Sequence, residues 1–516
     1  MTTVGTARAG RREWIGLAVI ALPSVLYSMD LTVLYLAVPS LTQDLQPSSS
    51  QLLWITDIYG FLIAGLLITM GTLGDRIGRR RLLLIGAAGF GAASVVAAFS
   101  TSAEMLVAAR ALLGVAAATL APSTLSLIRN MFHDPAQRTV AIGFWVTSYS
   151  VGAAIGPLVG GLLLESFWWG SVFLLAVPVM VLLLLVGPRL LPEFRDPQPG
   201  RFDLASAALS LVSVLAVIYG VKRMAEEGFG SQPALAIAAG LVVGVVFLRR
   251  QGRLSDPMID LRLFREPAFS ASLAANALAL FAVFGVDLFI AQYLQLVLGM
   301  GPFEAGLWTL PSAAGFIVGS MLAPAIARAV RPASLVAGGL VVAAVGLAML
   351  TRVGADSGLA ALVAGSVILA LGAAQVVTLS TDLIVGAAPP ERAGTASGIS
   401  ETGTELGGAL GIAILGSLGT AVYRSEVSDA VPGGVPSHAG EAVKDTLGGA
   451  VGVADRVPSS LIDAATGAFA HGLQVAAATS AVLMLGMAVL AAILLREPRT
   501  DQAVGDQADV APVVAG

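Results

Sequence analysis

The sequence has few charged residues and no cysteine. Charged side chains make up 12% of its 516 residues, whereas a typical soluble domain carries about 25%. The absence of cysteine excludes disulfides, thiolate metal sites and cysteine nucleophiles. The three histidines lie far apart in the sequence, and no GxxxxGK[ST] phosphate loop occurs. We therefore expect no metal, no cofactor and no direct coupling to ATP. The net charge of −4 does not indicate a nucleic-acid partner.

Hydrophobic residues, by contrast, make up 56% of the chain, and the mean hydropathy is +0.85. Because so few charged residues cannot cover a water-facing surface, we expect lipid to be the main solvent. About twenty apolar residues are needed to cross the hydrocarbon core. Segments of that length predict an all-α polytopic membrane protein with fourteen transmembrane helices, near residues 14–38, 51–71, 82–100, 104–128, 140–164, 168–188, 203–221, 232–249, 268–294, 304–327, 333–351, 358–386, 393–422 and 469–495.

The basic residues predict the orientation of these helices. Cytoplasmic loops of membrane proteins are enriched in Lys and Arg. With both termini cytoplasmic, most of the 29 basic residues fall in cytoplasmic segments, and Lys222 and Arg223 are among the few external ones. The apolar run near the N-terminus is too long for a signal peptide, so we expect it to remain as the first helix. The excess of Arg over Lys is typical of a GC-rich bacterial genome, which predicts a multi-pass protein of the bacterial inner membrane.

The predicted helices fall into a 6 + 2 + 6 arrangement. Two inserted helices, at 203–249, separate two blocks of six, and their segments around 203–221 and 232–249 carry no internal acid. The external segment 423–468 is rich in Gly, Ser, Pro, Asp and Val, which predicts a small hairpin or a partly mobile loop. The remaining segments are an N-terminal cytoplasmic tail at 1–13, an N-terminal bundle at 14–190, a C-terminal bundle at 268–495 and a C-terminal tail at 496–516.

A glycine- and arginine-rich motif lies between the second and third predicted spans. It runs Gly71-Thr-Leu-Gly74-Asp75-Arg76-Ile-Gly78-Arg79-Arg80-Arg81. A basic cytoplasmic loop would obey the positive-inside rule without the ordered glycines and the aspartate. The pattern therefore predicts a tight turn with a function of its own.

Two more motifs lie inside predicted spans. The fourth span holds Arg110 between Leu106 and Gly114, and a lone arginine in a membrane is generally functional or paired. The fifth span holds small residues at short intervals, which favour close packing of helices. These residues are Gly152, Gly156, Pro157, Gly160 and Gly161.

Together these motifs resemble the signature loop, the second motif and the antiporter motif of the major facilitator superfamily. Two further segments, Met29-Asp30-Leu-Thr32 and Gln51-Leu-Leu-Trp54-Ile-Thr-Asp57-Ile-Tyr59, make the chain similar to the fourteen-helix drug:proton antiporter branch. Within that branch it resembles the QacA/SmvA/LfrA group of pumps for quaternary ammonium compounds and dyes, over essentially its whole length. The resemblance implies the major facilitator fold, a monomer, and conformational or gating roles for the motif residues.

Five acidic residues lie well within predicted spans: Asp30, Asp57, Asp287, Glu401 and Glu405. A charged carboxylate at the centre of a bilayer costs roughly 2.5–3.5 kcal/mol. At about 1.5 Å per helical residue, Asp30 and Asp57 lie at similar depths in the outer half. Glu401 and Glu405 are four residues apart and share a helix face. Each acid has a structural alternative, as a hydrogen-bond donor that locks neighbouring helices, and one of them can pair with Arg110.

Because Arg110 is the only basic residue inside a predicted span, most of these acids are expected to lack an internal cation. A carboxyl in a low-dielectric site holds its proton unless a cation replaces it. Proton and cationic substrate then compete for one site, which is the coupling that an antiporter needs. Aromatic rings add cation–π attraction of about 0.5–2 kcal/mol each. The candidates, any of which can equally be a packing residue, are Trp54, Tyr59, Tyr149, Phe281, Phe284 and Phe316.

The resemblance carries substrate and proton-coupling roles over to Asp30, Asp57 and Glu405. Two departures from QacA put the transport of divalent cations in doubt. The acid of the tenth span is absent, with Phe316 in that stretch, and the paired acids of the thirteenth span are reduced to Ser400-Glu401. Asp287 has no counterpart in the resembling pumps, so it either substitutes in part or faces the external vestibule.

We therefore expect a proton-coupled multidrug efflux antiporter for lipophilic, mainly monovalent cations, and not an enzyme. An exporter of an endogenous natural product is the alternative, because the fifth-span motif does not separate the two. A membrane sensor with a transporter-like fold is disfavoured, since it would need neither the signature loop nor the acids.

Overall fold

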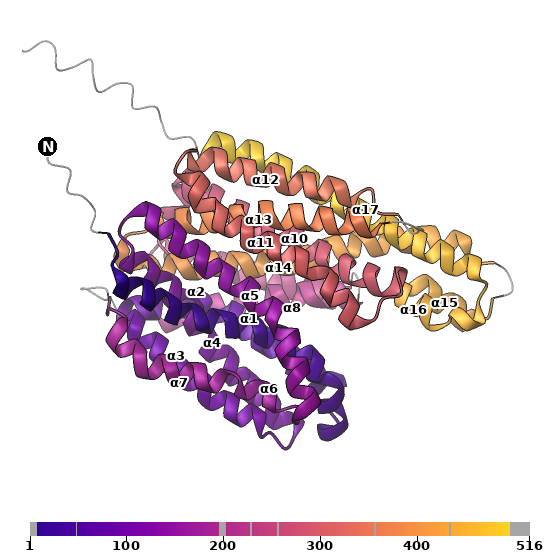
Figure 1. Ribbon diagram of the computed structural model, residues 1–516, viewed down its shortest axis with the longest axis horizontal. Helices are drawn as coiled ribbons and strands as arrows, with labels where there is room; N and C mark the ends of the chain where they lie inside the picture. Colours follow the sequence, from indigo (N-terminus) through magenta and orange to yellow (C-terminus); the bar gives the residue numbers. More distant parts are fainter. Residues whose placement is uncertain are drawn as a thin grey trace, which may run out of the picture.

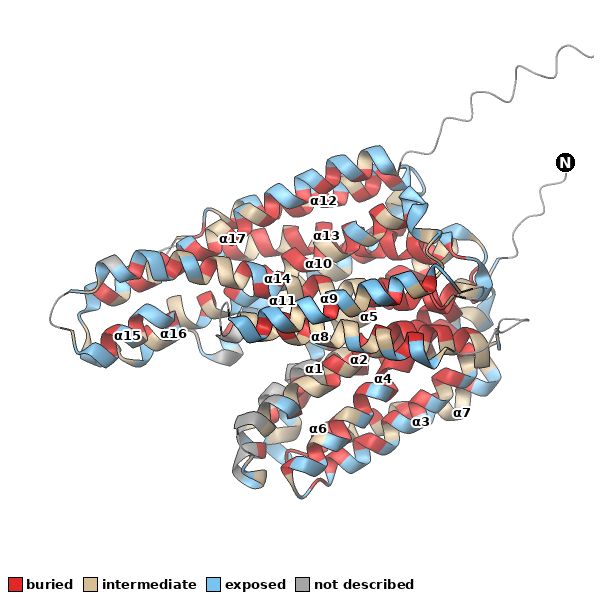
Figure 2. Cartoon of the chain, turned by 180° about the vertical axis from the view of Figure 1, so that it is seen from behind, coloured by how far each residue is buried: buried red, intermediate tan, exposed pale blue. Residues whose placement is uncertain are grey.

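Helices account for all the regular secondary structure in the described part of the chain. The computed structural model describes residues 8–47, 49–195, 203–227, 230–254, 257–354, 358–432 and 435–495. The predicted tails therefore lie largely outside the described residues. Residues that face the interior of the bundles are buried, and many on the outside are exposed (Figure 2). The exposed residues include many large apolar ones. Leu185, Leu235 and Val482 are 62%, 69% and 70% exposed, as expected for side chains that face lipid.

The first half of the chain forms one helical bundle, drawn in indigo and purple in Figure 1. In it α1 packs on α5, α2 on α4, and α3 on both α4 and α7. The predicted sixth span is broken at Leu175, since Pro178 has no N–H for the carbonyl of Leu174. The helices are α1 (Arg11–Leu45), α2 (Ser49–Ile77), α3 (Arg79–Ala98), α4 (Ala103–Met131), α5 (Pro135–Ser166), α6 (Ser171–Leu174) and α7 (Ala176–Leu190).

Local sequence explains where these helices begin. The hydroxyl of Ser102 accepts a hydrogen bond from the Met105 N–H and caps α4. Asp134 caps α5 in the same way, and Pro135 occupies the first turn, where no N–H is needed.

The two inserted helices, α8 (Leu204–Glu227) and α9 (Ser231–Gln251), pack against each other. Helix α8 also contacts both α2 and α14, so it bridges the two halves of the chain. At its start, Asp203 pairs with Arg250 of α9. Desolvation raises the pKa of Asp203, but hydrogen bonds from Ser206 and the pairing with Arg250 outweigh it, so the pKa is lowered overall.

The second half forms the other bundle, in which α12 packs on α13 and α17, and α10 on α14. Its helices are α10 (Pro267–Gln292), α11 (Pro302–Ala327), α12 (Pro332–Leu350), α13 (Leu359–Ala387), α14 (Ala393–Ala430), α15 (Ser437–Asp445), α16 (Leu447–Gly452) and α17 (Ser459–Leu494). The short turns η1 (Leu263–Arg265), η2 (Tyr293–Val297), η3 (Pro390–Arg392) and η4 (Ala454–Arg456) complete it.

Thirteen helices among the described residues are long and apolar enough to cross a membrane. Each corresponds to a predicted span, from the second to the fourteenth. Helix α1, with 35 residues, holds the predicted first span and is not among the thirteen. The chain is therefore an all-helical integral membrane protein, and the count of fourteen spans stays a prediction.

The molecule has two distinct ends, and Figure 1 shows them on opposite sides. We call "basic end" the end that holds the start of α1, the α2–α3 turn and the start of α14. The opposite end holds α15 and α16. The predicted hairpin or loop at 423–468 is largely helical instead, because α14 and α17 continue past their apolar cores to Ala430 and from Ser459. The Tyr423 hydroxyl donates to the Val443 carbonyl at 2.7 Å and fastens this region.

Candidate functional site

A cluster of tyrosines lies beside Glu405 where the two halves meet. Glu405 lies on α14, and its Oε1 accepts a hydrogen bond of 2.8 Å from the hydroxyl of Tyr27 on α1. The ring of Tyr27 lies 5.5 Å from that of Tyr149 on α5 and 6.2 Å from that of Tyr59 on α2. Trp145 stacks edge-on against Tyr149 at 4.9 Å. One carboxyl of the second half is thus joined through Tyr27 to a cluster of aromatic rings of the first half.

Asp30 is paired with the buried arginine of α4. The guanidinium of Arg110 donates to the Asp30 carboxylate, and its Nε donates to the Ile55 carbonyl at 3.1 Å. Arg110 is fully buried and lies over the Tyr59 ring, 4.4 Å from its centroid. Of the two options for Asp30, the structure shows the paired one.

Asp57 is paired as well, with a lysine of the inserted helix α8. The ammonium of Lys222 lies 2.7 Å from Asp57 Oδ1 and 4.8 Å from the centroid of the Phe61 ring. Trp54 packs edge-on against Phe61 at 6.3 Å, with 43% of its surface exposed. Asp57 therefore has a cationic partner at the end of α8, in addition to the pair that Arg110 forms with Asp30.

Lys222, predicted in an external segment, lies within helix α8. A boundary set by hydropathy ends at Val221, before the first charged residue, whereas α8 continues to Glu227. The long aliphatic stem of lysine lets the charge reach a partner from the end of an apolar helix.

Glu401 and Asp287 differ from the paired acids. In the described residues, neither forms a hydrogen bond or an ion pair. Glu401 is half-buried and interacts electrostatically with Tyr149 and Glu405. Asp287 is exposed on α10, beside Phe284, which is 46% exposed.

The other predicted aromatics lie in packed positions. Phe281 is buried, and its backbone meets Gly411 of α14. Phe284 packs over Gly408 of α14, and Phe316 lies partly buried against the core. Tyr59 and Tyr149 are thus the predicted aromatics that belong to the Glu405 cluster.

Sequence reasoning missed Tyr27, Trp145 and Lys222. Tyr27 had a signal, because it precedes Asp30 by three residues and so shares its helix face. Lys222 also had one, as one of very few lysines in the chain. Nothing in the sequence distinguished Trp145 from a packing residue. In the described part of the chain, no group of three or more His, Asp or Glu side chains is arranged to hold a metal ion.

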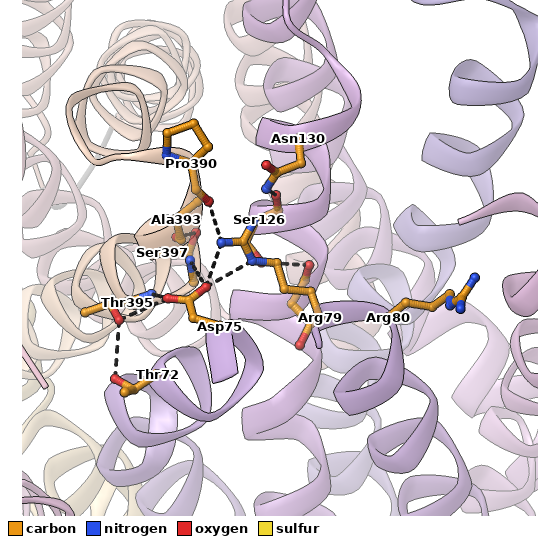
Figure 3. A network of polar contacts seen from close by, with 12 residues as sticks. Thr72, Asp75, Arg79, Arg80, Ser126, Asn130, Pro390, Ala393, Thr395 and Ser397 are labelled. Carbon is orange, nitrogen blue, oxygen red and sulfur yellow. Dashed lines mark hydrogen bonds and ion pairs between the residues drawn. The ribbon is translucent and has the colours of Figure 1, made fainter. Parts of the chain in front are cut away.

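At the basic end, Asp75 joins the two halves through the start of α14 (Figure 3). Its carboxylate accepts hydrogen bonds of 2.9 Å from the N–H groups of both Gly394 and Thr395. These are among the first N–H groups of α14, where a helix favours a negative charge. Arg79 holds the same carboxylate at 2.8 Å and donates to the Pro390 carbonyl at 2.5 Å. Asp75 and Arg79 are 4% and 1% exposed, so this contact is sealed from solvent.

The glycines of the signature motif make this approach possible. A β-carbon at Gly71 would collide with the carbonyl of Gly394. Gly78 adopts φ +109° at the turn into α3, a conformation that favours glycine. Gly74 packs closely on Leu82, and Arg76 lies in the last turn of α2. The motif is therefore a contact between halves as well as a tight turn.

A second contact at the basic end joins α5 to α13. Asp382 accepts hydrogen bonds of 2.5 Å from Arg138 Nε and 2.6 Å from the hydroxyl of Thr139. Further along α5, the hydroxyl of Thr147 lies 2.6 Å from the hydroxyl of Ser320 on α11. The two halves are thus fastened at several points at this end.

The fifth-span glycines pack α5 against α1. A β-carbon at Gly152 would collide with the Val25 carbonyl, and one at Gly160 would lie 2.7 Å from Val33. Gly156 is buried, whereas a β-carbon at Gly161 would meet nothing within 4 Å. The side chain of Pro157 lies outside the described residues.

We expect Asp75→Asn to open the basic end. Hydrogen bonds to a charged group contribute about 1.5–3 kcal/mol each, so their weakening should raise the open fraction at least about tenfold. Because the chain has no cysteine, Ala396→Cys, at a fully buried position of α14, gives a single reporter. Its labelling rate by N-ethylmaleimide should rise about tenfold in Asp75→Asn.

Glu193→Gln is the matched control for this labelling. Glu193 accepts hydrogen bonds from the N–H groups of Arg80 and Arg81, at 3.1 and 3.2 Å, within the first half only. It should leave the labelling rate unchanged. Equal labelling of Ala396→Cys with and without Asp75→Asn would contradict a closing role of Asp75.

Comparison with known proteins supplies the context for this arrangement. The sequence profile of the Major Facilitator Superfamily matches residues 20–412. The chain is 45% identical to the multidrug efflux pump LfrA of Mycolicibacterium smegmatis, over 96% of this chain and 98% of that protein. It is 35% identical to the methyl viologen resistance protein SmvA of Salmonella typhimurium, over 92% and 97%. The crystal structure of the human organic anion transporter MFSD10 shares the fold, with a TM-score of 0.62 and 16% identity over 93% of this chain and 99% of that chain.

Proposed function

The chain belongs to the Major Facilitator Superfamily, and from this premise we propose that it is a proton-coupled multidrug efflux antiporter of the bacterial inner membrane. Its substrates are lipophilic, mainly monovalent cations such as quaternary ammonium antiseptics, dyes such as ethidium and cationic antibiotics. The efflux and resistance functions in the names of its relatives support export of toxic compounds. It is a transporter and not an enzyme, and it works as a monomer.

The observation that carries the proposal is the environment of Glu405. Its carboxyl accepts a hydrogen bond from Tyr27 across the two halves, lies beside the cluster that Tyr27 forms with Tyr59 and Tyr149, and has no ion-pair partner in the described residues. A carboxyl in such a site holds a proton until a cation replaces it. Aromatic faces attract organic cations by about 0.5–2 kcal/mol each. The site can therefore accept either a proton or a cation of loosely defined shape.

The other acids have different parts in this mechanism. The Asp30–Arg110 pair is internally neutral and positions Tyr59 through the guanidinium that lies over its ring. Glu401 precedes Glu405 by one helical turn, on the side of the basic end, and is a second proton acceptor along that face. Asp287, exposed on α10, provides an additional acceptor.

Alternating access follows from the contacts at the basic end. We assign this end to the cytoplasm, because basic residues gather in cytoplasmic loops. The contacts of Asp75 and Asp382 then close the cytoplasmic side. Their release lets substrate enter from the cytoplasm or inner leaflet and displace the proton from Glu405. Closure followed by reprotonation from outside releases the substrate there.

An efflux assay tests this function. The chain is expressed in a pump-deficient bacterium, the cells are loaded with ethidium, and the loss of fluorescence is followed after energisation. We expect efflux several-fold faster than in cells without the chain, and we expect a protonophore to abolish the difference. Efflux equal to that of control cells would contradict the proposal and favour export of an endogenous natural product. Efflux that survives the protonophore would contradict proton coupling.

A further inference from the structure

The inserted helix α8 brings a positive charge to the site where the two halves meet. It packs against α2 of the first half and α14 of the second. One helical turn before Lys222, the contact of α8 with α2 and α14 is apolar. There Ile218 packs with Phe61 and Ala64 and with the partly buried Leu406. Leu406 is the neighbour of Glu405 in the sequence. The insertion is therefore a wall of the site as well as a spacer between the bundles.

Lys222 is the charged residue that this wall presents. Its ammonium lies 2.7 Å from Asp57, over the face of Phe61 at 4.8 Å, and it also interacts electrostatically with Glu405. The side chain of Lys222 is 38% exposed, and that of Asp57 is 20% exposed. The pair is thus open on one side, and its flexible lysine can be displaced.

The contacts of Lys222 are those that a cationic substrate would make. An ammonium bound to a carboxylate and an aromatic face is the arrangement by which proteins recognise organic cations. Here a side chain of the protein already occupies that arrangement. A positive charge beside the binding site also repels a ligand in proportion to the ligand's own charge.

We propose that Lys222 is an internal counter-cation that sets the charge selectivity of the site. It neutralises Asp57 and disfavours divalent cations more strongly than monovalent ones. This inference rests on the proposed function and gives the inserted helices a role in it. With Asp30 held by Arg110 and Asp57 held by Lys222, Glu405 and Glu401 are the carboxyls of α14 left for ligand and proton. Removing the lysine frees one more carboxylate for a second ligand charge.

A pair of dyes separates ligand charge from ligand shape. Ethidium and propidium share one phenanthridinium ring system and carry one and two positive charges. Binding is measured by fluorescence on the purified full-length protein in detergent, for the wild type and for Lys222→Met. A unit charge about 10 Å away at an effective dielectric constant of about 20 changes ion binding roughly tenfold. We therefore expect Lys222→Met to raise the affinity for ethidium about tenfold and that for propidium by about a further tenfold.

Three variants serve as controls. Lys222→Met combined with Asp57→Asn removes both charges and should return both affinities to within about threefold of wild type. Lys222→Arg keeps the charge and should keep the preference for ethidium. Arg223→Met removes a charge from the next position of the same helix, where Arg223 lies over Tyr219. It should change the ratio of the two affinities by less than about threefold.

The outcomes are distinguishable from a failure of the proposed function. Wild-type protein that binds neither dye contradicts both proposals. Wild-type protein that binds ethidium, with an unchanged affinity ratio in Lys222→Met, overturns the counter-cation role alone. If Lys222→Met loses both dyes and the double variant remains equally defective, Lys222 is a structural residue, and the inference is overturned.

Discussion

Glu405→Gln is expected to lower the energised ethidium efflux that the chain adds above the rate of cells without it at least about 100-fold. Glutamine can still accept the hydrogen bond from Tyr27, so the shape of the site is kept. It can neither release a proton nor attract a cation by its charge. Two unit charges about 4 Å apart interact by about 4 kcal/mol at an effective dielectric constant of about 20, which exceeds what a 100-fold change requires. Efflux rates normalised to the amount of protein in the membrane give the measurement.

Glu426→Gln is the matched control for this prediction. Glu426 lies on the same helix, α14, but is exposed and contacts His471 far from the tyrosine cluster. The control should pump like the wild type. Glu405→Gln with efflux within about threefold of wild type would show that the carboxyl bonded to Tyr27 is not the coupling site.

Arg110→Met is expected to destabilise the folded protein strongly. Arg110 is fully buried and holds both Asp30 and the Ile55 carbonyl. Removing one partner of a buried ion pair costs about 3–5 kcal/mol, since an uncompensated charge is left behind. We expect a lower yield of monodisperse protein and a thermal midpoint several degrees lower, measured by fluorescence-detected size exclusion in detergent.

A second substitution separates charge from packing at this position. Arg110→Met with Asp30→Asn removes both charges and should recover a large part of the lost thermal stability. Arg110→Lys keeps the charge but not the guanidinium geometry, so it should lie between the wild type and Arg110→Met. A double variant as unstable as Arg110→Met would mean that Arg110 acts through packing and not through Asp30.

The membrane helices could be predicted from the sequence because their signal is local. About twenty apolar residues with few charges define a span, whatever the span packs against. Boundaries were less accurate where a helix continued beyond its apolar part. The extension of α14 to Ala430 carries Arg424, Glu426 and Asp429, and charges of this kind read as a loop. For the same reason the predicted seventh span ended before Lys222, which lies within α8.

The acids of the site could also be found in advance, but their partners could not. A carboxyl in an apolar span stands out by its cost. The cation or hydroxyl that pairs with such a carboxyl depends on how the helices pack. Glu405 meets Tyr27 across 378 residues of sequence, and Asp57 meets Lys222 across 165. The contact of Asp75 with Thr395 spans 320 residues. Asp75 was recognisable from its motif, whereas its role in joining the halves was not.

These pairings redistribute the roles that the sequence suggested. Asp30 and Asp57 were expected to bind protons and substrate alongside Glu405, with most acids lacking a cation. Both are instead paired with basic residues of the chain itself. This leaves Glu405 as the carboxyl in contact with the aromatic cluster. We therefore propose one principal exchange site, with Asp57 available to a cation only when Lys222 moves away.

Proton release on substrate binding tests exchange at Glu405 most directly. Purified protein in weakly buffered detergent solution near neutral pH is mixed with ethidium, and a pH indicator dye follows the solution. If cation and proton compete for one carboxyl, the wild type should release about one proton for each ethidium bound, and Glu405→Gln should release none. Ethidium binding to the wild type without proton release, or equal release from Glu405→Gln, would contradict proton–cation exchange at this residue.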